Sequence, residues 1–151
     1  MTKEISRYIV RVYAIILNTN NEILISDEFQ MNMRMTKFPG GGMHFGEGAI
    51  DCLKREAVEE FGQEIEVLEH FYTTDFFQQT QFYADAQLIS IYYRAKFIAP
   101  VKFYISDKSF NFEQEQNGAQ SFRWVKLNEL NPEEMIFPID KKVVKLLREN
   151  I

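Results

Sequence analysis

The stretch GGMHFGEGAIDCLKREAVEEFG, residues 41–62, joins a glycine-rich segment to a helix pattern that carries closely spaced glutamates. Apolar residues recur along it at the spacing of one helix face: Ile50, Leu53, Ala57 and Phe61. Gly62 follows the last of them, where the C-terminus of a helix favours glycine. The pattern predicts a helix over residues 49–61 with this apolar stripe turned towards the core.

Three carboxylates, Glu56, Glu59 and Glu60, fall within roughly 100° of one side of that helix, because a helix turns about 100° per residue. Like charges so placed repel one another. Such a cluster is typical of a ligand set for Mg²⁺, which prefers oxygen ligands and is commonly shared between carboxylates and substrate phosphates. Taken alone, however, a run of this kind is more often a solvated helix face.

The residues around the glutamates add two further elements. The glycines at positions 40–42 allow the backbone to approach a metal or a phosphate with no side chain in the way. Glu47 lies at the helix entry, where the helix dipole favours a carboxylate. Arg55 can pair with Glu47 or Glu59 and orient it, because a guanidinium binds a carboxylate bidentately.

The complete spacing is Gly41, five residues, Glu47, seven residues, and then Arg-Glu-Ala-Val-Glu-Glu-Phe-Gly over residues 55–62. It resembles the signature box of the Nudix hydrolases, which reads G, five residues, E, seven residues, REUxEExGU, where U is apolar. Every glycine and charged position of the box is filled. The last U position holds Gln63, a departure at a position that serves packing. The box covers about a sixth of the chain.

The resemblance implies a divalent-metal-dependent pyrophosphohydrolase acting on a nucleoside diphosphate linked to another moiety. A nucleotide sugar, a dinucleoside polyphosphate and a nucleoside triphosphate are the substrate classes that remain open. The metal implied is Mg²⁺, with Mn²⁺ as a substitute. By similarity its ligands are the side chains of Glu56, Glu59 and Glu60 and the carbonyl of Gly40. Catalysis would rest on these glutamates, with Glu56 a candidate base and Arg55 and Glu47 as supporting groups.

Several other residues are candidates for the same site. Members of the family often take a further acidic ligand from a distant loop, and here Glu113 and Glu115 qualify. Glu115 is favoured of the two, although an ordinary loop role fits it equally well. Substrate binding is assigned to Gly41, Gly42 and Arg94, although a structural role fits Arg94 equally well.

The rest of the chain predicts an α/β (α+β) protein. Strand patterns occupy residues 8–17, 22–26, 34–38, 65–77, 87–98 and 121–127. The turn residues 18–21 make the first two strands a hairpin. Residues 138–149 predict a terminal helix, with proline in the first turn and an apolar face. Together with the box, this order resembles the family's αβα sandwich, a mixed β-sheet with helices on both faces.

Length and composition limit the number of domains, the partners and the cellular location that we expect. The 151 residues predict a single Nudix domain over residues 1–151. The net charge of −5 disfavours long nucleic acid as a partner, whereas a small nucleotide-like substrate remains suitable because a metal reverses the local field. No apolar window is long enough for a membrane span. We therefore expect a cytoplasmic protein without membrane contact, as a monomer or, as is frequent in the family, a homodimer.

Two alternative functions remain open at this point. One is a Nudix module that senses a nucleotide without cleaving it. The other is an isoprenoid diphosphate isomerase, although that chemistry needs a catalytic cysteine and the sole one, Cys52, lies inside the box helix. The surrounding carboxylates are expected to raise its pKa and so to disfavour the nucleophilic thiolate. His44 is interpreted as a loop residue rather than as an acid or base.

Overall fold

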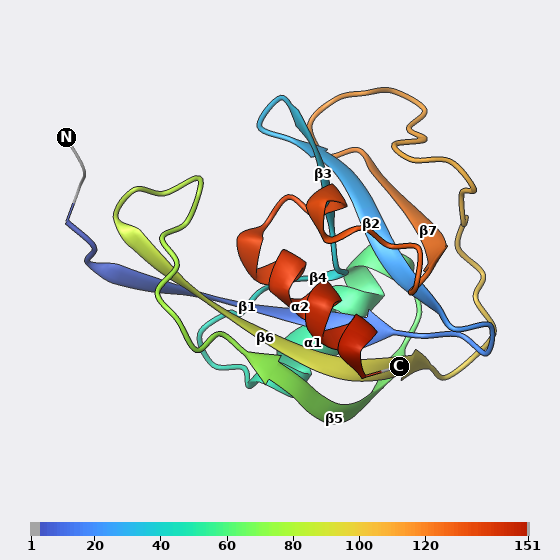
Figure 1. Ribbon diagram of the computed structural model, residues 1–151, viewed down its shortest axis with the longest axis horizontal. Helices are drawn as coiled ribbons and strands as arrows, with labels where there is room; N and C mark the ends of the chain where they lie inside the picture. The colour runs from blue at the N-terminus through green and yellow to red at the C-terminus, as the bar shows by residue number, and fades with distance from the viewer. Residues whose placement is uncertain (1–3, 151) are drawn as a thin grey trace. The chain divides into compact units, whose positions relative to one another are not determined.

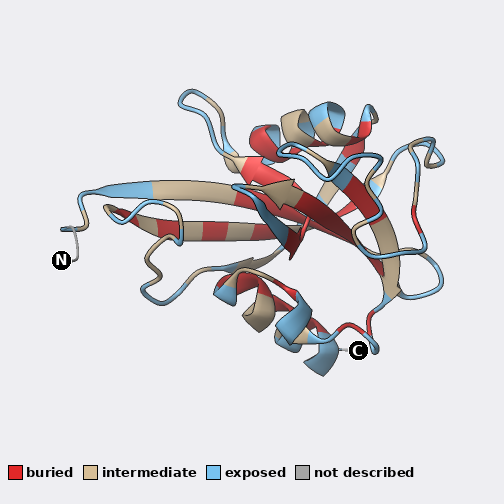
Figure 2. Ribbon diagram, turned by 90° about the horizontal axis from the view of Figure 1, so that it is seen from above, coloured by how far each residue is buried: buried red, intermediate tan, exposed pale blue. Residues whose placement is uncertain are grey.

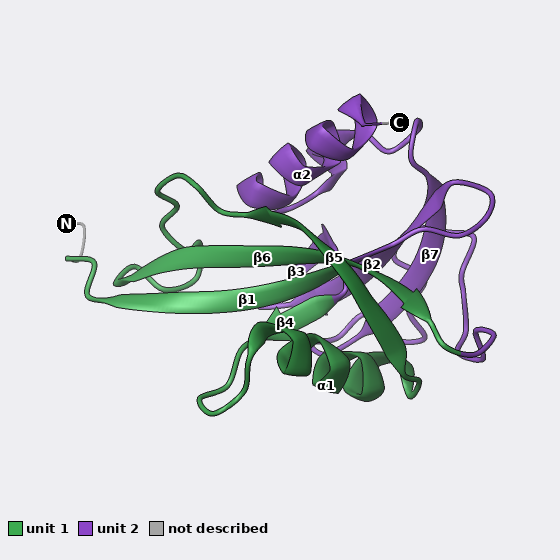
Figure 3. Ribbon diagram, turned by 90° about the horizontal axis from the view of Figure 1, so that it is seen from below, with its two compact units in different colours: residues 1–14, 40–98 green, residues 15–39, 99–151 purple. Residues whose placement is uncertain are grey.

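The computed structural model describes residues 4–150, which divide into two compact units. Within that range the first unit comprises residues 4–14 and 40–98, and the second comprises residues 15–39 and 99–150 (Figure 3). The segment that contains the box lies entirely in the first unit. No helix of the described residues is long and apolar enough to cross a membrane.

The first unit is built on a four-stranded sheet in the order β4-β1-β6-β5. Its strands are β1 (Arg7–Ile16), β4 (Gly40–Gly42), β5 (Ile65–Thr73) and β6 (Ala86–Phe97). β4 pairs antiparallel with β1, and β5 pairs antiparallel with β6. The arrows of β1 and β6 run in the same direction in Figure 1, which makes the sheet mixed. Buried and half-buried residues alternate along most of β6 (Figure 2), as expected of a strand with two unequal faces.

The helix α1 (Ala49–Phe61) has the predicted bounds. It ends at Gly62, which has a φ of 66° and donates its N–H to the Val58 carbonyl. The predicted stripe is buried except for Ile50, which lies in the first turn and is 43% exposed. Cys52 is buried in its place. Two strands cover the helix, since α1 packs against both β4 and β5.

The second unit contains a three-stranded antiparallel sheet in the order β3-β2-β7. Its strands are β2 (Glu22–Gln30), β3 (Met33–Lys37) and β7 (Gln120–Lys126), followed by the short helix η1 (Pro132–Glu134) and by α2 (Pro138–Glu149). The predicted apolar face of α2 is buried at Ile139, Val143 and Leu147. Mixed strands with two α-helices confirm the α+β class.

The prediction of a hairpin between residues 8–17 and 22–26 is correct for the turn and wrong for the strand pairing. Leu17 and Ile23 form a single bridge, and the side chain of Asn18 caps the turn between them. β1 and β2 then continue in separate sheets. The long hairpin is instead β2–β3, whose turn places Met31 and Asn32 at positive φ without the glycine that usually signals such a turn.

Three other segments also differ from the prediction. Residues 40–42, for which no strand was predicted, form the strand β4. β2 extends to Gln30, past the apolar run, because Ser26, Asp27 and Glu28 are buried in hydrogen-bonded polar contacts rather than exposed. The strand β5 stops at Thr73, short of residue 77.

Substitution of Gly40 tests how closely the strands β4 and β1 approach each other. The φ of Gly40 is 148°, and a Cβ there would overlap the Val12 carbonyl and approach the Tyr13 Cα at 2.8 Å. We expect Gly40→Ala to lower the free energy of unfolding by about 3 kcal/mol or more, since strain and overpacking add. Urea denaturation measures the change. Gly118→Ala, also at positive φ but in open space, is the control and should cost only about 1 kcal/mol. Equal losses would contradict the close approach.

Candidate active site

The loop between β4 and α1 turns Glu47 towards Arg55. Gly46 has a φ of 91°, and the Glu47 N–H donates to the His44 carbonyl. Arg55 then binds Glu47 bidentately, with Nε donating to Oε2 at 3.0 Å and Nη2 to Oε1 at 2.7 Å. The backbone N–H of His44 donates to the same carboxylate at 2.8 Å. Both charged side chains are largely buried, with exposures of 24% for Arg55 and 15% for Glu47.

The same guanidinium binds two further glutamates and the glycine strand. Its Nη1 donates to Glu56 Oε1 at 3.0 Å and to Glu59 Oε2 at 3.1 Å. Its Nη2 donates to the Gly42 carbonyl at 2.9 Å. One cation therefore gathers three carboxylates and the β4 backbone into a single cluster, which we call the Arg55 cluster.

The ionisation of the cluster follows from these contacts. Hydrogen bonds from Arg55, and then from the His44 backbone, lower the pKa of Glu47 from 4.5 to about 2. The same pairing raises the pKa of Arg55. Three glutamates and one arginine sum to a formal charge of −2, which favours an additional cation.

Glycine at position 41 allows the helix to approach β4 closely. A Cβ on Gly41 would overlap the carboxylate of Glu56, whose side chain is only 15% exposed. Cys52 packs against the same backbone, with its Sγ 3.6 Å from the Gly42 carbonyl. Burial, and then the charge of Glu47, raise the pKa of this thiol to about 11. Cys52 is thus protonated at neutral pH, which removes the basis for a nucleophilic role.

The glutamates do not already form a metal cage. Within residues 4–150, no three His, Cys, Asp or Glu side chains converge as a ready-made metal centre. Glu56 and Glu59 instead each direct one oxygen to Arg55, and Glu60 is half-buried on the same helix.

Two of the predicted site residues make other contacts. Glu115 belongs to the second unit, where Arg34 binds it bidentately at 2.7 and 2.8 Å and lowers its pKa. Arg94, on β6, pairs with Glu69 at 3.2 Å and lies over the ring of Phe71. Both contacts of Arg94 fit a structural role, which was one of its two predicted roles.

Sequence reasoning missed one basic residue beside the glycine strand. Arg11 on β1 is in register with Gly42, and a Cβ on Gly42 would lie 4.0 Å from its Nη1. Arg11 Nε also donates to the Tyr13 hydroxyl at 2.6 Å. The available signal was a cation inside an otherwise apolar strand.

Comparisons with known proteins place this geometry in a family. A family model of the NUDIX domain matches residues 7–147. No curated protein sequence matches the chain.

Solved structures show the same fold at low identity. The E. coli ORF135 protein is 18% identical, with a TM-score of 0.71 over 95% of this chain and 90% of that one. The MutT protein of Methanosarcina mazei Go1 is 20% identical, with a TM-score of 0.68 over 99% of each chain. An ADP-ribose pyrophosphatase of Streptococcus suis is 16% identical, with a TM-score of 0.60 over 93% of this chain and 87% of that one. On the match that spans nearly its whole length, this chain belongs to the Nudix family of hydrolases.

Proposed function

We propose that the chain is a Mg²⁺-dependent pyrophosphohydrolase that cleaves a nucleoside diphosphate linked to a further moiety. The observation that carries the proposal is the Arg55 cluster: three carboxylates held on one guanidinium against a strand of glycines. A structural surface helix has no need of such an arrangement, because its charges are usually solvated. We propose that the range matched by the family model, residues 7–147, is one catalytic domain.

The donor set that the signature box predicts fits a hard divalent cation. Glu56, Glu59 and Glu60, with the Gly40 carbonyl, offer oxygen ligands only, which suit Mg²⁺ and its substitute Mn²⁺. When bound, the metal supplies charge neutralisation at the phosphoryl oxygens and acidifies the attacking water. Glu115 stays a prediction of the sequence as a further ligand; within the second unit both of its carboxylate oxygens accept hydrogen bonds from Arg34.

Arg55 and Glu47 act as positioning residues. Arg55 fixes one oxygen of Glu56, and Glu47 fixes Arg55 through two hydrogen bonds. Glu56 is therefore held in one rotamer beside Gly41, where it can accept a proton from the attacking water. Gly41, Gly42 and Arg11 line up along β4 and β1, and the positive charge of Arg11 favours a substrate phosphate there. Arg94 remains a second candidate for a phosphate contact.

The alternatives lack a supporting observation of this kind. A sensor would not need the full set of box glutamates, and the protonated, buried Cys52 does not suit an isomerase that depends on a thiolate. We therefore place the chain among catalytic members, acting on a small nucleotide-like substrate in the cytoplasm.

The substrate class is tested with a panel assayed in Mg²⁺ and again in EDTA, with products resolved by chromatography. The panel holds ADP-ribose, other nucleotide sugars, diadenosine polyphosphates, ordinary and oxidised nucleoside triphosphates, and isopentenyl diphosphate. We expect cleavage of one nucleotide class that EDTA abolishes. Turnover unaffected by EDTA would overturn the metal requirement, and metal-dependent binding without product would favour the sensor.

Removing one negative ligand tests the glutamates. Glu59→Gln and Glu60→Gln should each lower kcat/KM by about a hundredfold or more, because metal-ion stabilisation of transition-state charge is worth several kcal/mol. Circular dichroism should show an unchanged fold. Glu64→Gln, exposed just beyond the helix, is the matched control and should retain activity. Full activity in both helix variants would refute the ligand assignment.

The ion pair between Glu47 and Arg55 should make stability depend on pH in a defined window. Because the pKa of Glu47 falls from 4.5 to about 2 on folding, the pair contributes fully above about pH 4.5 and loses its contribution as pH falls towards 2. Wild type should thus be more stable than Glu47→Gln at pH 7, and the difference should shrink below pH 4.5.

Urea titrations of both proteins between pH 7 and 2.5 measure that difference. Glu66→Gln, which removes the exposed pair with Lys96, is the control and should have little effect at any pH. A difference between wild type and Glu47→Gln that stays constant down to pH 2.5 would contradict the assignment.

A further inference from the structure

The two faces of β4 are turned towards different side chains of the first unit. A Cβ on Gly41 would overlap the Glu56 carboxylate, whereas a Cβ on Gly42 would lie 4.0 Å from Arg11 Nη1. Because successive residues of a strand point to opposite faces, Glu56 and Arg11 lie on opposite sides of β4. A single strand of glycines therefore separates a carboxylate of the Arg55 cluster from the guanidinium of Arg11.

This strand is also an edge of its sheet, because β4 pairs only with β1 in the order β4-β1-β6-β5. All three of its residues, 40–42, are glycines. No side chain of β4 stands between its two faces, and glycine is the residue that lets a ligand approach the backbone closely. A ligand at this edge can therefore contact groups on both faces of the strand.

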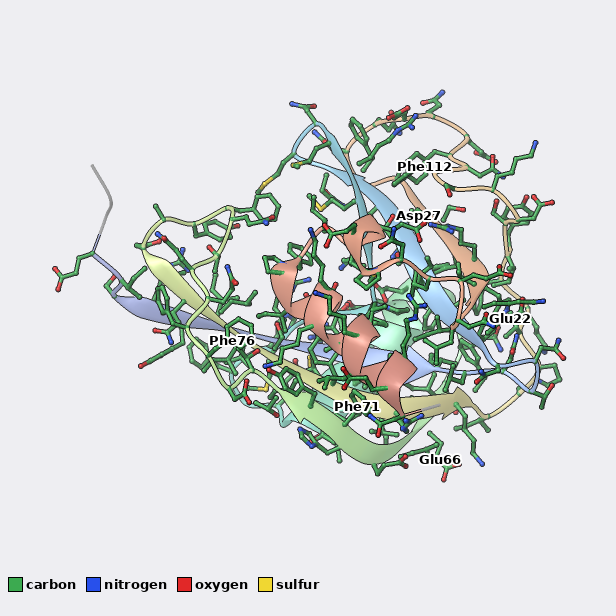
Figure 4. All side chains as sticks on the ribbon, viewed as in Figure 1. Glu22, Asp27, Glu66, Phe71, Phe76 and Phe112 are labelled. Atoms are coloured by element: carbon green, nitrogen blue, oxygen red, sulfur yellow. The ribbon has the colours of Figure 1, made fainter. Side chains whose placement is uncertain are left out.

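A buried tyrosine fixes the direction of the Arg11 side chain. Arg11 Nε donates to the Tyr13 hydroxyl at 2.6 Å. Tyr13 is 1% exposed, and its ring stacks on that of the fully buried Tyr92, with the centroids 5.3 Å apart. On β5, where Figure 4 labels Phe71, the next residue Tyr72 adds a third ring, 6.3 Å from that of Tyr92. The hydroxyl that holds Arg11 thus belongs to a packed aromatic group and has little freedom to move.

The contact with Tyr13 orients Arg11 without adding a negative charge. A hydroxyl accepts a hydrogen bond as a neutral group, whereas the acceptors that hold Arg55 include three carboxylates. A guanidinium binds phosphate oxygens through its planar fork of donors, and fixing that fork in advance reduces the entropy lost on binding. Arg11 is half-buried, so its attraction for an anion is screened less than that of an exposed arginine.

We propose that Arg11, positioned by Tyr13, binds a phosphate of the substrate on the face of β4 opposite Glu56. The substrate then lies across the glycine edge, with one phosphate on the side of the Arg55 cluster and another at Arg11. This inference rests on the proposed hydrolase function and adds to it the placement of the two phosphates. Tyr13 is a positioning residue, because it acts through Arg11 rather than on the substrate.

The kinetic test uses the substrate that the Mg²⁺ panel identifies. Arg11→Gln should raise KM about tenfold or more with little change in kcat, because the contact is made in the ground state and in the transition state alike. Tyr13→Phe keeps the stacked ring and should raise KM about threefold or more, because the guanidinium is no longer fixed. Arg11→Lys keeps the charge without the fork and should fall between wild type and Arg11→Gln.

Arg7→Gln is the matched control, because Arg7 lies on the same strand in an exposed pair with Asp85. It should leave KM and kcat unchanged. An unchanged KM in Arg11→Gln, or an equal rise in Arg7→Gln, would overturn the phosphate contact. An unchanged KM in Tyr13→Phe would overturn the positioning role.

A second measurement needs no turnover. The full-length ¹⁵N-labelled protein is titrated, in Mg²⁺, with imidodiphosphate, in which a nitrogen replaces the bridging oxygen of pyrophosphate, and the arginine Nε–Hε signals are followed by NMR. The Arg11 signal, assigned by its loss in Arg11→Lys, should shift saturably, and the Arg7 signal should not. Tyr13→Phe should weaken the binding.

The two measurements separate this inference from the proposed function. An Arg11 signal that does not move would overturn the inference even if the panel reveals hydrolysis. A saturable shift of Arg11 with no hydrolysis of any panel member would support the phosphate contact while the proposed function fails.

Discussion

The guanidinium of Arg55 is the group on which the geometry of the candidate active site depends. Glu47, Glu56 and Glu59 would repel one another without it, and their side chains would spread into solvent. A planar fork of donors can bind one carboxylate bidentately and still reach others, which a lysine ammonium cannot do with the same directionality. The cluster therefore combines fixed positions with a residual negative charge, the two conditions that a divalent cation requires.

The Arg55 cluster also depends on the glycines of β4. The carboxylate side of α1 can lie against β4 because Gly41 lacks a side chain, since a Cβ there would occupy the place of the Glu56 carboxylate. The Gly42 carbonyl then becomes an acceptor for Arg55. Helix, strand and loop are thus coupled through backbone atoms, so that a change in any one of them shifts the carboxylates.

The second unit also contains charged side chains that are held together by ion pairs and hydrogen bonds. Its sheet buries charged residues on β2, where Asp27 is bound by Arg123 and Thr36 and Glu28 by Lys37. Buried charges of this kind are costly unless every partner is in place. The N–H of Phe110, in the loop before β7, donates to Asp27 and so ties that loop to the sheet. The buried polar contacts thus hold the loop before β7 in a defined position.

The sequence by itself determined the box, the bounds of both α-helices and the class of the fold, because helical periodicity, glycine caps and invariant spacing are local properties of the chain. It also indicated that Arg55 would bind Glu47 or Glu59, since all three lie within one short segment, and Arg55 binds both. Only the tertiary structure decided that residues 40–42 form a strand, that β1 and β2 part after one bridge, and that Asp27 and Glu28 are buried. These features depend on partners distant in the chain, and strand pairing and the burial of a charge are settled by such partners rather than by neighbouring residues.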